Sequence, residues 1–199
     1  MAPPPKPSFV AHAPTVGPAH IHAAIERLAD LIVRSHPAPF DLILLGIANG
    51  GIELARRLAH RLQAARVGTI DVSFHRDDIG RSPIPKDFSP TFIPADVQGA
   101  TVILVDDVLF SGRTVKAALD ELFDHGRPAK VELAVLVDRG GRKLPLAADY
   151  TGLILDAARD EKVLVTLDRD DSARDSISIV PPARPGPISK PPSRKTKVS

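Results

Sequence analysis

Cysteine and tryptophan are absent from the 199-residue chain, and tyrosine and methionine occur once each. Without cysteine the protein forms no disulfide and has neither a thiol nucleophile nor a thiolate metal ligand, which fits a reducing compartment. No apolar run approaches the length of a membrane span, and the first residues lack the pattern of a signal peptide. We therefore expect a cytoplasmic protein that contacts no membrane.

Acidic residues are missing from both ends of the sequence. Residues 1–20 and 181–199 together hold 6 of the 26 lysines and arginines and none of the 24 acids, so residues 21–180 carry a formal net charge of −4. The same ends hold 12 of the 20 prolines. Such composition buries too little apolar surface to offset the entropy lost on folding. We expect disordered tails at 1–18 and 181–199; the basic C-terminal tail either touches nucleic acid through its charge or only improves solubility.

The central residues 19–180 are enough for one domain with a sizeable core, and their apolar pattern alternates between strands and helices. Apolar runs and alternating patterns typical of strands occupy residues 40–46, 67–74, 102–105, 130–137, 150–155, 162–167 and 176–180. Helical spacing of apolar residues occupies 21–35, 52–62 and 115–123. This alternation predicts an α/β fold with a mostly parallel, twisted sheet flanked by helices.

One segment carries most of the chemical information. Residues 102–105 are apolar, Asp106 and Asp107 follow, and a turn of small residues from Ser111 to Thr114 leads into a helix. Paired carboxylates at the carboxyl edge of a sheet can accept hydrogen bonds from two neighbouring hydroxyls, such as a ribose diol. Hydroxyls and free N–H groups at a helix start favour a phosphate. Each fragment alone also fits a solvated loop or a simple helix cap, but their combination favours a sugar phosphate.

Other loops should reach the same edge, because ligands in such sheets bind beyond the carboxyl ends of the strands. The glycine-rich segment 48–51 can present N–H groups to a pyrophosphate, or it is only a tight turn. Arg76 lies in a long segment with several prolines and little periodicity. It either closes over a leaving pyrophosphate or pairs with Asp77 or Asp78.

The segment 102–114 resembles the motif with which type I phosphoribosyltransferases bind phosphoribosyl pyrophosphate (PRPP). The segments 45–47 and 71–78 before it and 125–128, 133–140 and 142–150 after it match the register of the PyrR family, pyrimidine operon regulators that are also uracil phosphoribosyltransferases. The resemblance implies a type I phosphoribosyltransferase fold with a small hood and a flexible loop, and a dimer. It also implies conversion of PRPP and uracil to UMP and pyrophosphate, with Mg²⁺ carried by the substrate rather than by a protein cage.

The resemblance assigns roles to three loops and to Arg76. The PRPP-binding residues would be Asp106, Asp107, Val108, Leu109, Phe110, Ser111, Gly112, Arg113 and Thr114. The pyrophosphate loop would consist of Ala48, Asn49, Gly50 and Gly51, and the base pocket of Val137, Asp138 and Arg139. Among these residues, Asp106 and Asp107 would act in catalysis together with Arg76.

Several positions depart from the family pattern for RNA binding. Gly141, Ala147 and Leu153 stand where the family has His, Arg and Lys, and the acids Glu26 and Asp30 occupy positions where Thr and His are common. Each change removes a contact to phosphate or base, or adds repulsion. We therefore expect a working enzyme that binds RNA weakly or not at all. The alternative is a UMP-responsive RNA-binding regulator with weak or no catalysis.

Overall fold

A computed structural model describes residues 10–11, 15–63, 66–72 and 90–181 of the chain. Its strands are β1 (Val10–Ala11), β2 (Thr15–Val16), β3 (Ile43–Ile47), β4 (Arg66–Ile70), β5 (Thr101–Leu109), β6 (Lys130–Asp138), β7 (Tyr150–Leu155), β8 (Lys162–Thr166) and β9 (Ser176–Val180). Its α-helices are α1 (Pro18–Ser35), α2 (Gly50–Leu62) and α3 (Arg113–Asp124). Two short 3-10 helices, Pro39–Asp41 and Ser172–Arg174, complete the described elements.

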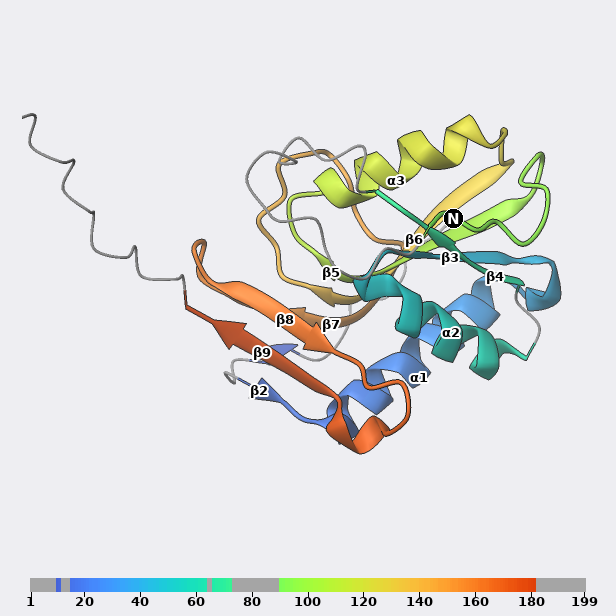
Figure 1. The fold of residues 1–199 in the computed structure, drawn as a ribbon. Helices are drawn as coiled ribbons and strands as arrows, with labels where there is room; N and C mark the ends of the chain where they lie inside the picture. Colours follow the sequence, from blue (N-terminus) through green and yellow to red (C-terminus); the bar gives the residue numbers. More distant parts are fainter. Residues whose placement is uncertain (1–9, 12–14, 64–65, 73–89, 182–199) are drawn as a thin grey trace, which may run out of the picture.

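Six strands form one sheet in the order β1-β7-β6-β5-β3-β4, and every pair in it is parallel. Helices α1 and α2 cover one face and α3 covers the other (Figure 1). Because both faces are covered, the central strands have long apolar runs, and in β3 all five residues are apolar and buried. This arrangement confirms the predicted α/β fold with a parallel sheet.

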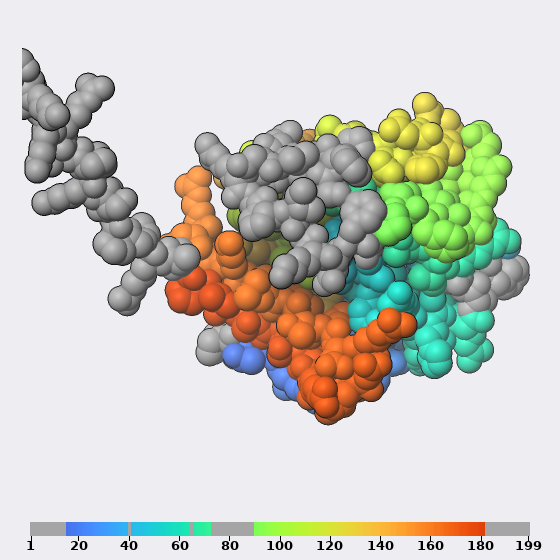
Figure 2. All heavy atoms as spheres, viewed as in Figure 1, coloured from blue at the N-terminus to red at the C-terminus, as the bar shows by residue number. Residues whose placement is uncertain are grey.

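The remaining strands form a smaller antiparallel sheet in the order β2-β9-β8, which we call the hood. The hood packs against α1 and reaches β5. In the space-filling view its orange and red residues lie directly beside the residues of α2 (Figure 2). The hood therefore adjoins the edge of the main sheet where β5 and β6 end.

The strand boundaries differ from the prediction at several points. Strand β5 continues through both acids to Leu109, because β6 runs beside it and pairs with Asp106, Val108 and Leu109. Strand β4 ends at Ile70, and a 3-10 helix precedes β3. Strands β1 and β2 lie in the range that the composition assigned to a disordered tail; each is two residues long and pairs with a distant strand, which composition does not reveal.

Arg76 and most of the long segment around it lie outside the described residues. The same holds for residues 182–199 of the basic tail. Among the helices that the structure describes, none combines the length and the apolar character needed to cross a bilayer.

Candidate active site

The turn between β3 and α2 packs directly against β5. A Cβ atom on Gly51 would lie 2.0 Å from the carbonyl oxygen of Val105, and one on Gly50 would lie 2.3 Å from Cγ of Asp107. Glycine is therefore required at position 51, where the obstacle is backbone, while a side chain at position 50 would displace the carboxyl of Asp107. The predicted pyrophosphate loop and the predicted diol-binding acid thus face each other.

The backbone of this turn is held by two neighbours. The N–H of Ala48 donates to the carbonyl of Ile70 over 2.9 Å, and the N–H of Ile52 donates to the carbonyl of Asn49 over 3.4 Å. The peptide bond between Ala48 and Asn49 is cis. Helix α2 then starts at Gly50, so the positive end of its dipole lies beside Asp107.

The two acids of β5 have different surroundings. Asp106 is only 6% exposed, and its Oδ1 accepts the N–H of Asp107 over 3.0 Å. Asp107 is half-buried on the α2 side of the sheet. Burial raises the pKa of the Asp107 carboxyl above its ordinary value, although the N–H of Val108 and a hydrogen bond with Asp106 oppose that shift. Asp107 is therefore the acid that meets the pyrophosphate loop.

The predicted phosphate loop leads from β5 into α3. Gly112 caps the helix with φ +86°, and the carbonyl of Gly112 accepts the N–H of Lys116 over 2.9 Å. Oγ of Ser111 accepts the N–H of Arg113 over 3.3 Å, and the Arg113 side chain is exposed. Gly112 at the cap has no side chain to accept the N–H groups that follow that of Arg113, so the start of α3 favours an anion.

Residues 139–142, which follow β6 and adjoin the predicted base pocket, form a turn that we call the base turn; it is bonded to the end of β5. Arg142 donates from Nη1 to the carbonyls of Leu109 (3.3 Å) and Phe110 (3.2 Å), and it pairs with Oδ2 of Asp138. Oδ1 of Asp138 accepts the N–H of Gly140 over 2.8 Å. The Asp138 carboxylate therefore shapes this turn. The turn and the phosphate loop are thereby fixed to each other.

Arg139 is 8% exposed and is directed at the hood. It donates from Nη1 to the carbonyl of Glu161 (2.8 Å) and from Nη2 to the carbonyl of Ala158 (3.1 Å), both in the connection between β7 and β8. Its guanidinium carbon lies 4.0 Å from the centre of the Phe110 ring, a cation–π contact. Its Nε is buried and has no hydrogen-bond partner among the described residues. Arg139 thus joins the base turn, the phosphate loop and the hood.

Sequence reasoning placed the main loops but not all of the supporting contacts. The side chain of Val137 is fully buried in the core, so only its backbone is left to line a pocket. The part that Arg142 plays in fixing the base turn was missed, although its position in an Arg-Gly-Gly-Arg run marks it as a cation near the site. The contacts of Arg139 with the hood carry no local signal, because their partners are about twenty residues away and are backbone carbonyls.

The comparisons with known proteins agree with this geometry. A family model described as phosphoribosyl transferase domain matches residues 19–167. The fold is similar to a hypoxanthine-guanine phosphoribosyltransferase from Bacillus anthracis (TM-score 0.62, 22% identity, 84% of this chain and 98% of that one). It is also similar to the hypoxanthine phosphoribosyltransferase of Trypanosoma cruzi (TM-score 0.61, 22% identity, 84% and 95%). The protein is a member of the phosphoribosyltransferase family.

Curated relatives narrow this class. The "Bifunctional protein PyrR" of Roseiflexus sp. is 44% identical over 166 residues, which span 80% of this chain and 90% of the relative. The protein of the same name from Streptomyces coelicolor is 46% identical over 173 residues, 83% and 89% of the two chains. Within the phosphoribosyltransferases, the chain therefore belongs to the PyrR family.

Proposed function

We propose that the protein is a uracil phosphoribosyltransferase, which converts PRPP and uracil to UMP and pyrophosphate. The observation that carries the proposal is the close approach of Gly50 to the Asp107 carboxyl. In PRPP the pyrophosphate is attached to C1 of the ribose, next to the diol at C2 and C3. A diol-binding acid and a pyrophosphate loop must therefore be neighbours, as Asp107 and the turn 48–51 are. Membership of the PyrR family supports uracil as the base.

In this proposal the protein acts mainly by positioning the reactants. Asp106 and Asp107 hold the ribose hydroxyls, while Ser111 and Thr114 at the start of α3 hold the 5-phosphate. The base turn brings N1 of uracil to C1 of the ribose. The bond from N1 to C1 forms as the bond from C1 to the pyrophosphate oxygen breaks, and the proton of N1 passes to solvent water. The backbone of the turn 48–51 receives the leaving pyrophosphate and stabilises its charge.

In the proposed reaction, Mg²⁺ enters the site bound to PRPP. Hard cations prefer oxygen ligands, and Asp106 and Asp107 supply carboxylate oxygens next to the proposed diol site, so the donor set fits. When bound to the oxygens of PRPP, Mg²⁺ neutralises part of the charge of the leaving group. A dimer and a cytoplasmic location stay predictions.

The direct test is an assay of the purified protein with PRPP, Mg²⁺ and one of five bases: uracil, orotate, hypoxanthine, guanine or adenine. Pyrophosphate release and the nucleotide product are both measured. We expect UMP formation with uracil, dependent on Mg²⁺, and none with the purines. Turnover of hypoxanthine or guanine without turnover of uracil would show that the base assignment is wrong, since the fold is shared with purine enzymes.

A second function, UMP-dependent binding of leader RNA, is favoured by the word "bifunctional" in the names of the relatives. The positions that depart from the family pattern weigh against it: Leu153 is fully buried, and Ala147 offers no donor. Binding of a pyrimidine leader RNA should therefore be weak, salt-sensitive and independent of UMP. Retention measured with and without residues 182–199 separates binding by the tail from binding by the domain. Tight binding that requires UMP would contradict this expectation.

A further inference from the structure

The hood strand β8 is held by an arginine of the main domain at each of its ends. At its amino end, Arg139 bonds to the connection 156–161, through the carbonyls of Ala158 and Glu161. At its carboxyl end, Arg57 of α2 bonds to the connection 167–175. Both arginines are connected to loops of the proposed active site. Arg57 lies on α2, which begins in the pyrophosphate loop, and Arg139 lies in the base turn itself.

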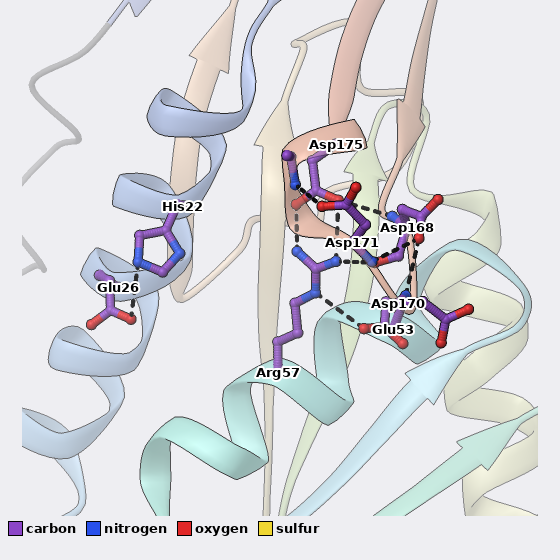
Figure 3. A network of polar contacts seen from close by, with 9 residues as sticks. His22, Glu26, Glu53, Arg57, Asp168, Asp170, Asp171 and Asp175 are labelled. Carbon is purple, nitrogen blue, oxygen red and sulfur yellow. Dashed lines mark hydrogen bonds and ion pairs between the residues drawn. The ribbon is translucent and has the colours of Figure 1, made fainter.

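Arg57 makes a dense set of contacts with the second connection (Figure 3). Its Nη1 and Nη2 both bond to the carboxylate of Asp175, with 3.1 Å between Nη2 and Oδ1, and Nη2 also donates to the carbonyl of Asp168 over 2.5 Å. Its Nε donates to Glu53 of the same helix over 3.0 Å. A two-pronged pair between a guanidinium and a carboxylate fixes both distance and orientation.

The carboxylate of Asp175 is also bonded within its own connection. Asp175 is only 3% exposed, and its Oδ1 accepts the N–H of Asp168 over 2.8 Å. In turn, Oδ1 of Asp168 accepts the N–H groups of Asp170 (3.0 Å) and Asp171 (2.9 Å). The connection between β8 and β9 is thus organised around the Asp175 carboxylate, to which Arg57 bonds.

Helix α2 does not need this contact to keep its own place. Leu54, Leu58 and Leu62 are buried in the core on the same helix, and Gly51 lies tightly against Val105. Removing the Arg57 guanidinium should therefore leave the pyrophosphate loop where it is. What loses its support is the hood.

We propose that Arg57 and Asp175 are positioning residues for base binding. Their pair holds the carboxyl end of β8 in place, which keeps the connection 156–161 on Arg139 and keeps Arg139 stacked on Phe110. The proposal rests on the proposed function, because it takes the turn after β6 to be the wall of the base pocket. Neither residue was assigned a part in the site from the sequence, and the pair joins positions 118 residues apart.

The consequence is a selective kinetic effect. Loosening the hood disturbs the base turn through Arg139. The diol and pyrophosphate sites do not depend on the hood, and the phosphate loop, although it loses the contact of Phe110 with Arg139, is still held by the bonds of Arg142 to the carbonyls of Leu109 and Phe110. For Arg57→Met we expect KM for uracil to rise about tenfold, with kcat and KM for PRPP changed less than about twofold. Arg57→Lys keeps the charge but makes one bond instead of a fork, so its KM for uracil should fall between those of the wild type and Arg57→Met.

The matched control is Arg61→Met. Arg61 lies one turn further along α2 and pairs with Glu26 of α1 over 2.5 Å, not with the hood. This variant removes the same charge from the same helix, together with an ion pair that is more exposed than that of Arg57. Its KM for uracil should equal that of the wild type.

Hydrogen exchange of the full chain, followed by mass spectrometry, reads out the hood without relying on turnover. In Arg57→Met, amides of 167–175 and also of 156–161 should exchange faster, while those of α2 and β5 keep their rates. Asp175→Asn, which retains an acceptor oxygen, should show the same pattern at smaller amplitude and serves if Arg57→Met does not fold.

Two experimental results distinguish a failure of the Arg57–Asp175 proposal from a failure of the proposed function. A variant that melts at lower temperature but keeps the wild-type KM for uracil and the wild-type exchange of 156–161 would reduce Arg57 to local support and overturn the proposal. Failure of the wild type to use uracil would contradict the proposed function alone. The exchange of 156–161 would then still decide whether the Arg57–Asp175 pair controls the far end of β8.

Discussion

Replacing Asp107 by Asn should separate what the site needs for activity from what the fold needs for stability. Asp107 is half-buried against the pyrophosphate loop, and burial raises the pKa of its carboxyl. In the proposed reaction the ionised carboxylate accepts hydrogen bonds from the ribose diol. Asn has the same shape but no charge, so the substitution removes mainly the charge.

The cost to activity can be estimated from hydrogen bonds to charged groups, which contribute about 1.5–3 kcal/mol each. Loss of one such bond from Asp107 corresponds to a fall of about 10- to 150-fold in kcat/KM for PRPP, since each 1.36 kcal/mol is a factor of ten. The measurement is initial rates of pyrophosphate release at several concentrations of PRPP.

The effect on stability should have the opposite sign. Because the pKa of Asp107 is raised in the folded state, the folded chain holds this proton more tightly than the unfolded chain does. Ionisation therefore costs folding free energy, fully above the raised pKa, and this cost disappears as the pH falls towards about 4. Asp107→Asn should be more stable than the wild type at pH 7.5, and the difference should shrink in acid.

Thermal unfolding at pH 7.5, 6 and 5 tests this, with Asp124→Asn as the control, because Asp124 is an exposed acid at the end of α3. The control should match the wild type in both activity and stability. If Asp107→Asn turns over PRPP at the wild-type rate, or unfolds more readily at pH 7.5, the reasoning about this carboxyl is wrong.

Two further substitutions test the packing of the site and of the sheet. Gly50→Ala should abolish pyrophosphate release, because its Cβ would collide with Asp107, whereas Gly17→Ala, which meets nothing within 4 Å, should keep full activity. Burial opposes ionisation of Glu132, but hydrogen bonds, led by that from Lys130, outweigh burial and lower the pKa of the Glu132 carboxyl. The ionised Glu132 therefore stabilises the fold at a pH above its ordinary pKa, and this stabilisation is lost in acid. In urea unfolding, Glu132→Gln should therefore lose about 1–3 kcal/mol at pH 7.5 and less at pH 4.5; an equal loss at both would contradict it.

The order of the three α-helices and of strands β3 to β9 could be predicted because each of these elements has a local cause. Helix α2 follows from the spacing of its leucines, and the strands of the main sheet follow from short apolar runs between helices. The end of β5 could not be predicted in this way. Carboxylates usually end a strand, but here β6 supplies partners for the backbone through Asp106 and beyond.

Contacts between residues far apart in the chain could not be predicted, because they produce no local pattern in the sequence. The pair of Arg57 and Asp175 spans 118 residues, and either residue alone is typical of a solvated surface. Strands β1 and β2 form because β7 and β9 offer them an open edge, not because two-residue segments prefer to be extended. The candidate site was therefore predictable in its loops, which carry motifs, and not in the contacts that hold those loops together.

The base turn links the departure from the family pattern at Gly141 to the structure of the site. A Cβ on Gly141 would lie 2.5 Å from the Phe110 ring, and its φ of +78° also disfavours a side chain. A His at this position, which the resemblance to the family implies, would displace Phe110 and break its stacking on Arg139. Arg142, the next cation, already bonds to the carbonyls of Leu109 and Phe110. Gly141 thus leaves Phe110 its place beside Arg139. We therefore expect the turn to serve the proposed base pocket and not to bind RNA.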